Sequence, residues 1–557
     1  MSRTFKLAGI LTIMLLNVPL LASALTELAT RAATGDLRCA RCHPAETAGY
    51  LETQMAHSSS GITCEPPGAF SHAVSNARFS VELTGSKQGL KMVQRLERDG
   101  FSGSYEPAYA IGSGSHAVAY LVETGGHLFQ SPICFYAGRG WDMAPGYEKN
   151  PQPDFQRPVT ADCLFCHVGK AQPVGGSLNR YRDPPITVEG ITCERCHGPA
   201  EAHLRNPVPG SIVNPAKLPA RARDSVCEQC HLSGEARITN PGRQLSDFQP
   251  PQDLEDVFSV YVFASSRDPS QPDALRVISQ AQQLALSTCF RRSNGKLWCG
   301  TCHDPHRQPT DAKAWFRARC LGCHGDGLLR THPKPNDDCI GCHMPHRPVS
   351  DGGHTVFTDH RIARRPLPET AAGAAPAVNS GGGPRVGDKQ TLVAWHSPST
   401  SALEQRNLGL AEVEVGERIK SVSMVSSGAR RLTECWSKFP NDAPVLTAIG
   451  QVMLGAGDAR NAASVFERAI QAQPDNPSNY IHAALAWKAA GDSQKAIERL
   501  EKALRLDPVM EQPYRVLAEV YGDENQPAMV HMTYERYLKA FPESIEAQQD
   551  VKDSAMR

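Results

Sequence analysis

The sequence predicts a mainly α-helical chain in two parts, and two repeated patterns support this prediction. A short cysteine motif occurs seven times between residues 39 and 343. In the last quarter of the chain, Pro440, Pro474, Pro508 and Pro542 recur every 34 residues, which is the period of a helix-turn-helix repeat. We therefore expect a first part of short helices and loops with a small β insert, followed by an α-solenoid.

Length and composition limit the possible functions. The chain has 557 residues, with 58 Lys and Arg against 58 Asp and Glu, so it lacks the basic surplus typical of nucleic-acid binding and no nucleic-acid partner is expected. The length predicts two or more domains. Its 18 cysteines are too many for an ordinary reduced enzyme and too sparse for a small disulfide-rich domain. Their spacing is therefore the informative feature.

Residues 1–24 have the pattern of a secretory signal. Arg3 and Lys6 precede an apolar run over 7–21, and the small residues at 22–24 form a cleavage site. We expect a mature chain that begins at Leu25 and is exported to the periplasm or the cell exterior. The alternative is an uncleaved anchor, because residues 7–25 nearly reach the length that spans a bilayer. Membrane contact would then be confined to this segment.

Each of the seven cysteine pairs is followed directly by a histidine. Cys-x-x-Cys-His is the attachment signature of c-type haem. The two thiols add to vinyl groups on one porphyrin edge, and the adjoining imidazole binds the iron as proximal ligand. The predicted thioether cysteines and proximal ligands are, in order, Cys39, Cys42 and His43; Cys163, Cys166 and His167; Cys193, Cys196 and His197; Cys227, Cys230 and His231; Cys299, Cys302 and His303; Cys320, Cys323 and His324; and Cys339, Cys342 and His343.

A zinc site or a redox dithiol is the alternative meaning of a Cys-x-x-Cys pair. Histidine accounts for 20 of the 557 residues, so seven chance placements after seven pairs have a probability of roughly ten to the minus ten. Export also favours covalent haem, which is attached outside the cytoplasm. We therefore predict seven c-type haems in a domain over residues 25–365. Their macrocycles would supply buried apolar surface in a chain with only 6% aromatic residues.

Four cysteines stand outside the motifs. They are Cys64, Cys134, Cys289 and Cys435. Cys64 and Cys134 could form a disulfide, but the sequence does not establish the pairing.

Ten further histidines precede residue 361, which is enough for every iron to have two imidazole ligands. They are His57, His72, His116, His127, His203, His306, His332, His346, His354 and His360. Two of them, His306 and His346, follow a motif histidine by three residues. Such a short stretch of chain is unsuited to reach the far face of the same haem, so we expect each to serve a neighbouring haem.

Three segments resemble the multihaem cytochrome c superfamily, which includes the tetrahaem carrier of the hydroxylamine pathway, cytochrome c nitrite reductase and octahaem enzymes. They are 193–199 with His203, 299–306, and 339–345 followed by His354 and 358–361. The resemblance is greatest to exported multihaem cytochromes with a C-terminal tetratricopeptide array. It implies His57, His203, His306, His332, His354 and His360 as distal ligands, with His72 and His116 in reserve.

Two departures from this superfamily bear on catalysis. No Cys-x-x-Cys-Lys motif occurs, which argues against a standard nitrite reductase. Gln280 stands where relatives often carry a histidine ahead of the Ser-x-Cys segment at 287–289. The resemblance therefore implies that one haem lacks its usual sixth ligand and has an open iron.

Two inserts interrupt the motif region. Over residues 78–136, alternating segments separated by Thr124, Gly125 and Gly126 predict an antiparallel hairpin. Residues 247–286 form a second insert, with a strand over 257–263 and a helical tail from Asp273. Either insert could cover a haem or bind a partner, and we favour a structural role for both.

Residues 366–395 are rich in Ala, Gly and Pro and are typical of a flexible linker. The repeat domain then occupies 396–557, with two clear repeats ending at Pro474 and Pro508, a looser one ending at Pro542 and a degenerate one before Pro440. Such an array presents a groove for a protein. It could dock a redox partner, pack on the haem domain of its own chain, or mediate self-association.

Electron transfer is the function that these patterns favour, with the repeats docking a redox partner. The alternative is an oxidoreductase in which one open haem acts on a small nitrogen or sulfur compound. A scaffold without redox function would leave seven haem motifs unexplained. Whether the chain is an enzyme stays open from the sequence, and no catalytic residue is assigned.

Overall fold

The computed structural model describes residues 37–63, 65–85, 91–267, 275–325, 327, 330, 332, 338–364, 391–396 and 401–556. The predicted signal segment, Cys64 and residues 365–390 of the linker region lie outside these ranges. Within them, no helix has the length and apolar character needed to cross a membrane.

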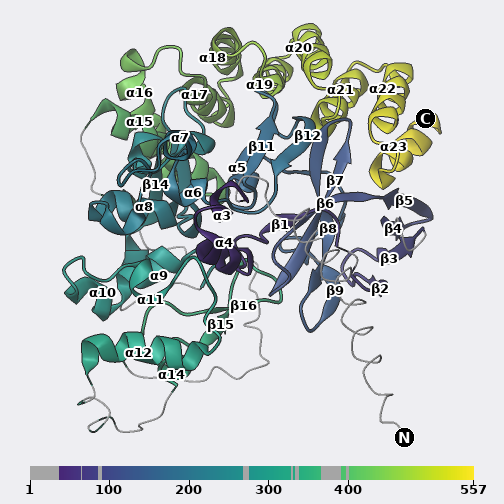
Figure 1. Cartoon of the computed structure of the whole chain (residues 1–557). Coiled ribbons are helices and arrows are strands. Elements are labelled where there is room, and N and C mark those ends of the chain that lie inside the picture. Colours follow the sequence, from purple (N-terminus) through teal and green to yellow (C-terminus); the bar gives the residue numbers. More distant parts are fainter. Residues whose placement is uncertain are drawn as a thin grey trace, which may run out of the picture.

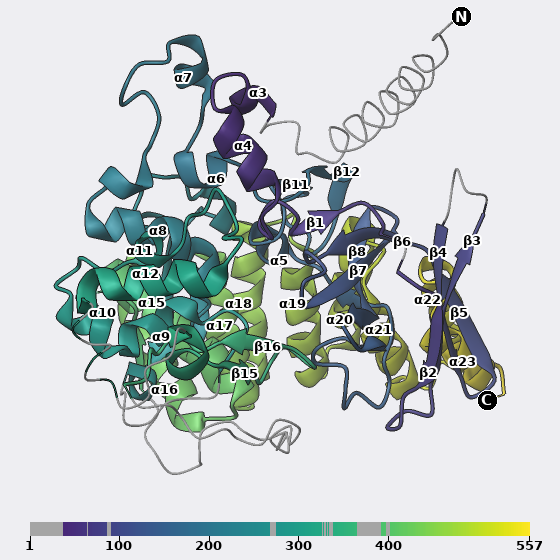
Figure 2. The ribbon, with the colours of Figure 1, turned by 60° about the horizontal axis from the view of Figure 1, so that its bottom comes forward.

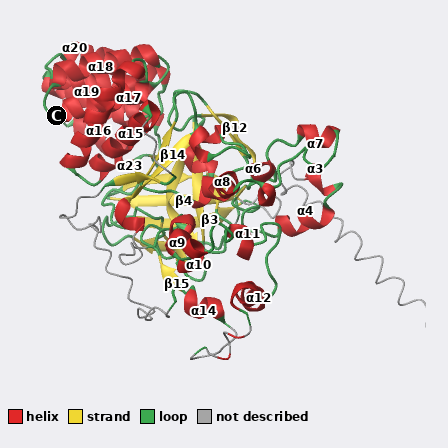
Figure 3. Cartoon of the chain, turned by 90° about the vertical axis from the view of Figure 1, so that its left-hand side faces the viewer, coloured by secondary structure: helices red, strands yellow, loops and turns green. Residues whose placement is uncertain are grey.

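A β-rich body, a group of short helices and a helical array make up the described chain (Figures 1 and 2). Five sheets are present among the described residues. The prediction of a mainly α chain is therefore correct only in part, because the β structure extends well beyond the small insert expected at 78–136. Secondary structure colouring shows the strands gathered between the array and the short helices (Figure 3).

The β-rich body contains two antiparallel sheets. One has the order β1-β6-β7-β8-β10, with β9 also paired to β8, and the other has the order β2-β3-β4-β5. The predicted hairpin is present, since Thr124 pairs with His127 and both Gly125 and Gly126 have positive φ angles in the turn. The strands are β1 (Ser59–Ser60), β2 (Gly68–Ser71), β3 (Arg78–Thr84), β4 (Lys91–Arg98), β5 (Phe101–Tyr105), β6 (Pro107–Ile111), β7 (Ala117–Thr124), β8 (His127–Tyr136), β9 (Gly140–Met143) and β10 (Arg157–Pro158).

The cysteine motifs lie on or beside short helices joined by loops. These helices are α3 (Leu37–Ala40), α4 (Pro44–Leu51), α5 (Ala161–Phe165), α6 (Glu194–His197), α7 (Glu201–Arg205), α8 (Ala220–His231), α9 (Gln280–Leu286), α10 (Thr288–Arg292), α11 (Cys299–Cys302), α12 (Ala312–His324) and α14 (Cys339–His343). Two small hairpins lie among them, β11 (Lys170–Pro173) with β12 (Tyr181–Val188) and β15 (His346–Pro348) with β16 (Val356–Thr358). Short 3-10 turns occur at Pro215–Lys217, Leu245–Asp247, Leu254–Asp256, Ala264–Arg267 and Trp436–Lys438.

A three-stranded sheet of order β13-β14-β17 joins the motif region to the array. Its strands are β13 (Ala236–Thr239), β14 (Phe258–Phe263) and β17 (Leu392–Ala394). The strand expected at 257–263 is thus present, and every one of its residues is buried. Residues 392–394 differ from the linker prediction, because this short apolar run supplies the second edge partner that the buried strand β14 needs.

The C-terminal helices form the predicted repeats. They are α15 (Ala402–Arg418), α16 (Val422–Cys435), α17 (Ala443–Gly455), α18 (Ala459–Ala472), α19 (Pro477–Ala489), α20 (Ser493–Leu506), α21 (Glu511–Asp523), α22 (Pro527–Ala540) and α23 (Ile545–Ala555). Ala462 and its equivalent Ala496 have no exposed surface, as helix crossings of this type require. Equivalent turns use Gly457, Gly491 and Asn525, all with positive φ angles.

The array packs against the rest of the chain along the turns that end its repeats. Asp475, Val509 and Glu543 are 34 residues apart, and each lies against a glycine of the β structure, at Gly176, Gly125 and Gly103 respectively. A Cβ added to Gly103 would lie 2.2 Å from the Glu543 carbonyl oxygen, so only glycine allows this approach. One edge of the array is therefore used within the chain itself, which is one of the three uses expected for it.

Candidate haem sites

The haem-attachment motifs adopt a single helical turn that places the two cysteines and the histidine together. The backbone amide of His43 donates to the Cys39 carbonyl at 2.9 Å, and His197 and His303 make the same bond within their own motifs at 2.9 and 3.0 Å. None of the fourteen motif cysteines is buried. Their side chains thus face space that protein atoms do not fill.

Several helices of this region bury nothing against protein. Helices α3, α6, α7, α10, α11, α12 and α14 contain no buried residue. Helix α12 is 13 residues long, and a helix of that length normally owes its stability to packing of an apolar face. A large apolar group outside the polypeptide fits this pattern, and covalently attached macrocycles would serve as the missing core.

Four motif histidines face a second imidazole. The ring centroids of His43 and His203 are 6.4 Å apart, those of His197 and His306 5.9 Å, those of His303 and His360 6.2 Å, and those of His343 and His332 5.9 Å. The first three pairs have interplanar angles between 23° and 30°, whereas the fourth is T-shaped at 82°.

The separation of these rings has the size that a shared metal requires. A metal bound by two opposed imidazoles at about 2 Å per nitrogen, with each ring centroid about 1 Å beyond its nitrogen, separates the centroids by about 6 Å. Direct stacking of two rings would bring the centroids closer, to about 4.5 Å at the near limit. The four pairs therefore fit the two faces of a haem iron.

Hydrogen bonds at Nδ1 orient these imidazoles. Nδ1 of His197 donates to the Val213 carbonyl at 2.8 Å, and Nδ1 of His343 donates to the Ala363 carbonyl at 2.6 Å. The second rings are held in the same way, because Nδ1 of His360 donates to the Thr358 carbonyl at 2.9 Å. This hydrogen bonding fixes the tautomer that leaves Nε2 as the metal-binding atom. The sequence carries no signal for such carbonyl partners.

The pKa values of these imidazoles are lowered, which favours the neutral form that binds a metal. Burial, followed by the nearby His360 and His231, lowers the pKa of His303 to about 4. Burial also lowers the pKa of His197, against the hydrogen bond to Val213, and His306 and His43 lower it further.

The remaining histidines predicted as distal ligands do not face a motif histidine ring. Nε2 of His57 lies 2.6 Å from the Leu51 carbonyl oxygen, although the hydroxyl of neighbouring Ser58 donates to the carbonyl of His167 in the second motif. His354 lies 3.2 Å from a carboxylate oxygen of Asp142.

The two reserve ligands also have other contacts. His72 is buried, and both of its ring nitrogens have hydrogen-bond partners, the Ser75 hydroxyl and the Glu148 carbonyl. The His116 ring packs on Phe357 at 4.5 Å. His346 is close to His116, because burial followed by the charge of His346 lowers the pKa of His116.

Gln280 lies beside the proximal histidine of the fourth motif. Burial lowers the pKa of His231, and a hydrogen bond with the Gln280 side chain acts in the opposite direction. The amide nitrogen of Gln280 also donates to the Val277 carbonyl at 2.8 Å. The residue that stands in place of a histidine in the sequence is thus next to a motif imidazole in the structure.

The motifs form one connected group through contacts of their cysteines and histidines. A hydrogen bond between the Cys227 and Cys299 thiols raises the pKa of Cys227 and lowers that of Cys299. A similar bond between Cys166 and Cys230 lowers the pKa of Cys166 to about 6. With haem attached these atoms are thioether sulfurs, so their titration does not matter but their proximity does.

Further contacts extend the group to all seven motifs. Cys196 lies near Cys227, Cys302 near Cys323, Cys320 near Cys339, and His43 near His197. The motifs consequently run in the order first, third, fourth, fifth, sixth and seventh, with the second joined to the fourth.

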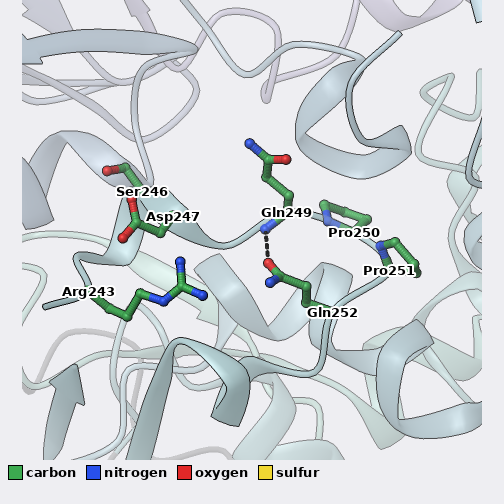
Figure 4. Close-up of a pocket in the computed structure, with 7 residues that line it drawn as sticks. All are labelled: Arg243, Ser246, Asp247, Gln249, Pro250, Pro251 and Gln252. Carbon is green, nitrogen blue, oxygen red and sulfur yellow. Dashed lines mark hydrogen bonds between the residues drawn. The ribbon is translucent and has the colours of Figure 1, made fainter. Parts of the chain in front are cut away.

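A polar hollow borders the third motif (Figure 4). It is lined by Arg243, Ser246, Asp247, Gln249, Pro250, Pro251 and Gln252, and the Gln249 amide donates to the Gln252 side chain at 2.9 Å. The Pro250 carbonyl lies so close to Gly198 that a Cβ there would be 2.8 Å from its oxygen. In the described ranges, no group of three or more His, Cys, Asp or Glu side chains converges as a metal-ion site.

Comparisons with known proteins match two separate parts of the chain. The family model described as cytochrome c554 and c-prime matches residues 144–198, which include the second and third motifs. The tetratricopeptide repeat model matches residues 453–520. The cytochrome match indicates electron transfer with c-type haem, and the repeats indicate interaction with protein.

Individual relatives match the repeats. The TPR repeat-containing thioredoxin TTL4 of Arabidopsis thaliana is 27% identical over 113 residues, which are 20% of this chain. The chain spans 16% of that protein's length. Among solved structures, the MamA protein is 18% identical with a TM-score of 0.23, covering 26% of this chain and 80% of that one. A thermophilic TPR protein of Thermus thermophilus is 15% identical with a TM-score of 0.24, covering 28% and 83%.

Proposed function

We propose that this chain transfers electrons through seven covalently attached c-type haems, one at each Cys-x-x-Cys-His motif. The observation that carries the proposal is the set of four imidazole pairs with ring centroids 5.9 to 6.4 Å apart. In this proposal His203, His306, His332 and His360 are the distal ligands of the first, third, seventh and fifth haems. His57 is assigned to the second haem, because the chain at Ser58 contacts His167.

The chemistry of such a site follows from its ligands. Haem iron supplies one-electron oxidation and reduction, and two imidazole ligands leave no coordination position for a substrate. Each imidazole pair comes from distant parts of the chain, as with residues 43 and 203. The pair therefore fixes both faces of one macrocycle and also ties two loops together, which suits a carrier that must change little between redox states.

The connected order of the motifs supports transfer along the chain. Six motifs follow one another through contacts of their own side chains, and the second branches from the fourth. Such an arrangement gives electrons a continuous route between two ends of the molecule. The signal-like segment at residues 1–24 supports an exported carrier, periplasmic or extracellular, that exchanges electrons with another protein through the repeats or the ends of this route.

Electron paramagnetic resonance of the oxidised holoprotein tests the proposal directly, because the spin state of each iron reports its sixth ligand. We expect low-spin signals to dominate. The variant His306→Ala should convert one haem to high spin, since it removes one of two axial imidazoles. The matched control His354→Ala removes a half-exposed histidine that faces Asp142 and should leave the spectrum unchanged. A high-spin signal in the control, or none in His306→Ala, would contradict the ligand assignment.

A second function is favoured by the contact between Gln280 and His231. An amide is a weak ligand for haem iron compared with an imidazole, so the fourth haem would have an open or exchangeable position. We infer that such a haem could bind a small nitrogen or sulfur compound, with the neighbouring haems supplying electrons. Addition of nitrite or hydroxylamine should then shift one high-spin signal, and Gln280→His should abolish that shift. An oxidised protein without any high-spin signal excludes this second function and leaves the carrier function intact.

A further inference from the structure

We propose that a basic face beside the fifth and sixth motifs docks an electron-transfer protein whose own docking face is acidic. We define the basic face by Arg291, Arg292 and Lys296 on and after α10, together with Lys313 and Arg319 on α12. The inference rests on the proposed electron-transfer function, since it assigns the place where one partner meets the chain.

Charge is concentrated in this part of an otherwise balanced sequence. Residues 288–325 contain seven Lys and Arg against two Asp, a net charge of +5, whereas the whole chain is neutral. Both acidic residues are already engaged. Asp304 pairs with Arg307 at 2.7 Å, and Asp311 accepts a hydrogen bond from the Ala314 amide at the start of α12. They therefore do not neutralise the basic face.

The side chains of α10 and its following turn are available to a partner. Arg291, Arg292 and Lys296 are exposed, and none forms an ion pair with any residue that the structure describes. On α12, Lys313 is 67% exposed and lies 3.4 Å from Asp338, and Arg319 stacks on Trp315 at 4.4 Å. The described part of α12 buries no side chain, so both helices present their cations outward.

The basic face is close to two haem-attachment motifs. Cys289 of α10 lies near Cys323, because burial followed by the charge of Cys323 raises the pKa of Cys289. Cys302 of the fifth motif is affected by both of these cysteines in the same way, after burial itself. A protein docked on α10 would thus stand next to the fifth and sixth haem positions, where a short path for electrons exists.

The opposite end of the route has a different character. Residues 37–57 around the first motif contain two Arg and two Glu, a net charge of zero, and Arg38 lies 3.4 Å from Glu194. An acidic partner is therefore attracted to one end only. Charge complementarity raises association rates and orients the encounter, which gives the route a preferred point of entry or exit.

Haem propionates are the competing explanation for these cations. The fifth, sixth and seventh haems would bring six propionates, and an arginine bound to one of them is not free for a partner. The two explanations differ in what they change. A propionate partner acts on the reduction potential of its own haem, whereas a docking residue acts on the rate of reaction with an acidic protein and on its dependence on salt.

The test compares two holoprotein variants with equal changes of net charge. Arg291→Glu/Arg292→Glu reverses charge on the basic face, and Arg505→Glu/Lys539→Glu reverses exposed charges on α20 and α22 of the array. Stopped-flow mixing with reduced flavodoxin, a small acidic redox protein, gives the second-order rate at low and high salt. We expect the first variant to react about tenfold more slowly at low salt with a flatter salt dependence. The array variant should stay within about twofold of wild type.

Each outcome decides the inference. Equal rates for both variants overturn it, and so does a rate loss in the first variant that a measured shift of haem potential explains in full, which assigns the arginines to propionates. Lys296→Glu, in the turn after α10, gives an independent check of smaller size if the double variant fails to fold. Wild-type protein whose haems cannot be reduced even by dithionite would instead refute the proposed electron-transfer function.

Discussion

Replacement of Asp507 by alanine tests how the repeat array is held on the β-rich body. Asp507 lies at the end of a repeat, and its side chain is 2% exposed. One carboxylate oxygen lies 2.7 Å from Nε2 of His127, which is equally buried, and the other accepts from the Ser177 hydroxyl at 2.7 Å. The variant would leave the His127 ring nitrogen and the Ser177 hydroxyl buried without this partner.

The size of the effect follows from the burial of the pair. Loss of one partner from a buried ion pair costs about 3 to 5 kcal/mol, which corresponds to about a hundredfold to a thousandfold in an opening equilibrium. The contact is local, because other bonds across the interface stay in place. These include the ion pair of Arg98 with Glu546 and the bond from the Gln156 side chain to the Ser544 hydroxyl.

Native-state hydrogen exchange is the suitable measurement, since a chain with several parts need not unfold in one step. Peptides covering residues 125–130 and 507–512 should exchange about a hundredfold faster or more in Asp507→Ala at neutral pH. The control Glu519→Ala removes an exposed ion pair with Lys488, which is worth at most about 1 kcal/mol. If both variants exchange alike in these peptides, the pair does not hold the array.

Three further outcomes are expected. Burial acts to raise the pKa of Asp507, but hydrogen bonds from His127 and Ser177 outweigh burial and lower it, so its stabilising effect is complete above about pH 4 and is lost only as the pH falls through the lowered value; exchange of 507–512 measured from pH 6 to 3 should show this. Burial raises the pKa of Asp154 to about 7, so wild-type stability should fall as pH rises from 5 to 8; Asp154→Asn should remove that slope in thermal unfolding, whereas the exposed control Asp523→Asn should keep it. The intact mass of the secreted protein should equal residues 25–557 plus seven haems, and a mass short by one haem would remove one motif from the proposal.

The repeated features of this chain could be predicted from its sequence because each is a local pattern. The Cys-x-x-Cys-His spacing fits one helical turn, as seen at His43 and Cys39. The 34-residue period places small residues at helix crossings, as seen at Ala462 and Ala496. Both patterns need only neighbouring residues, so no knowledge of the tertiary structure was required.

The partners of these features depend on tertiary structure. The rings of His43 and His203 meet across 160 residues, and the Val213 and Ala363 carbonyls that orient two imidazoles are backbone atoms without a sequence signature. Strand β17 was hidden at the end of a linker-like segment, because three apolar residues are too short a run to predict a strand without the buried edge that they pair with.

The fourth motif differs from the others in what holds it. Its helix α8 buries five residues, whereas the helices of the first, third, fifth, sixth and seventh motifs bury none. Glu228, inside this motif, accepts hydrogen bonds from the Trp395 indole at 2.9 Å and from His396 at 3.0 Å. These two residues directly follow strand β17, which lies at the start of the repeat domain.

The repeat array is therefore tied to the fourth motif as well as to the β-rich body. On its other side, Arg406 of α15 donates to the Thr239 carbonyl of β13 at 2.7 Å and pairs with Asp442 of the array. The motif that joins the second, third and fifth is thus the one that protein packing fixes from both directions. In a chain whose other motifs depend on their cofactors for a core, a rigid central junction keeps the branches at constant distances. We infer that the array serves as a frame for this junction in addition to any partner that it binds.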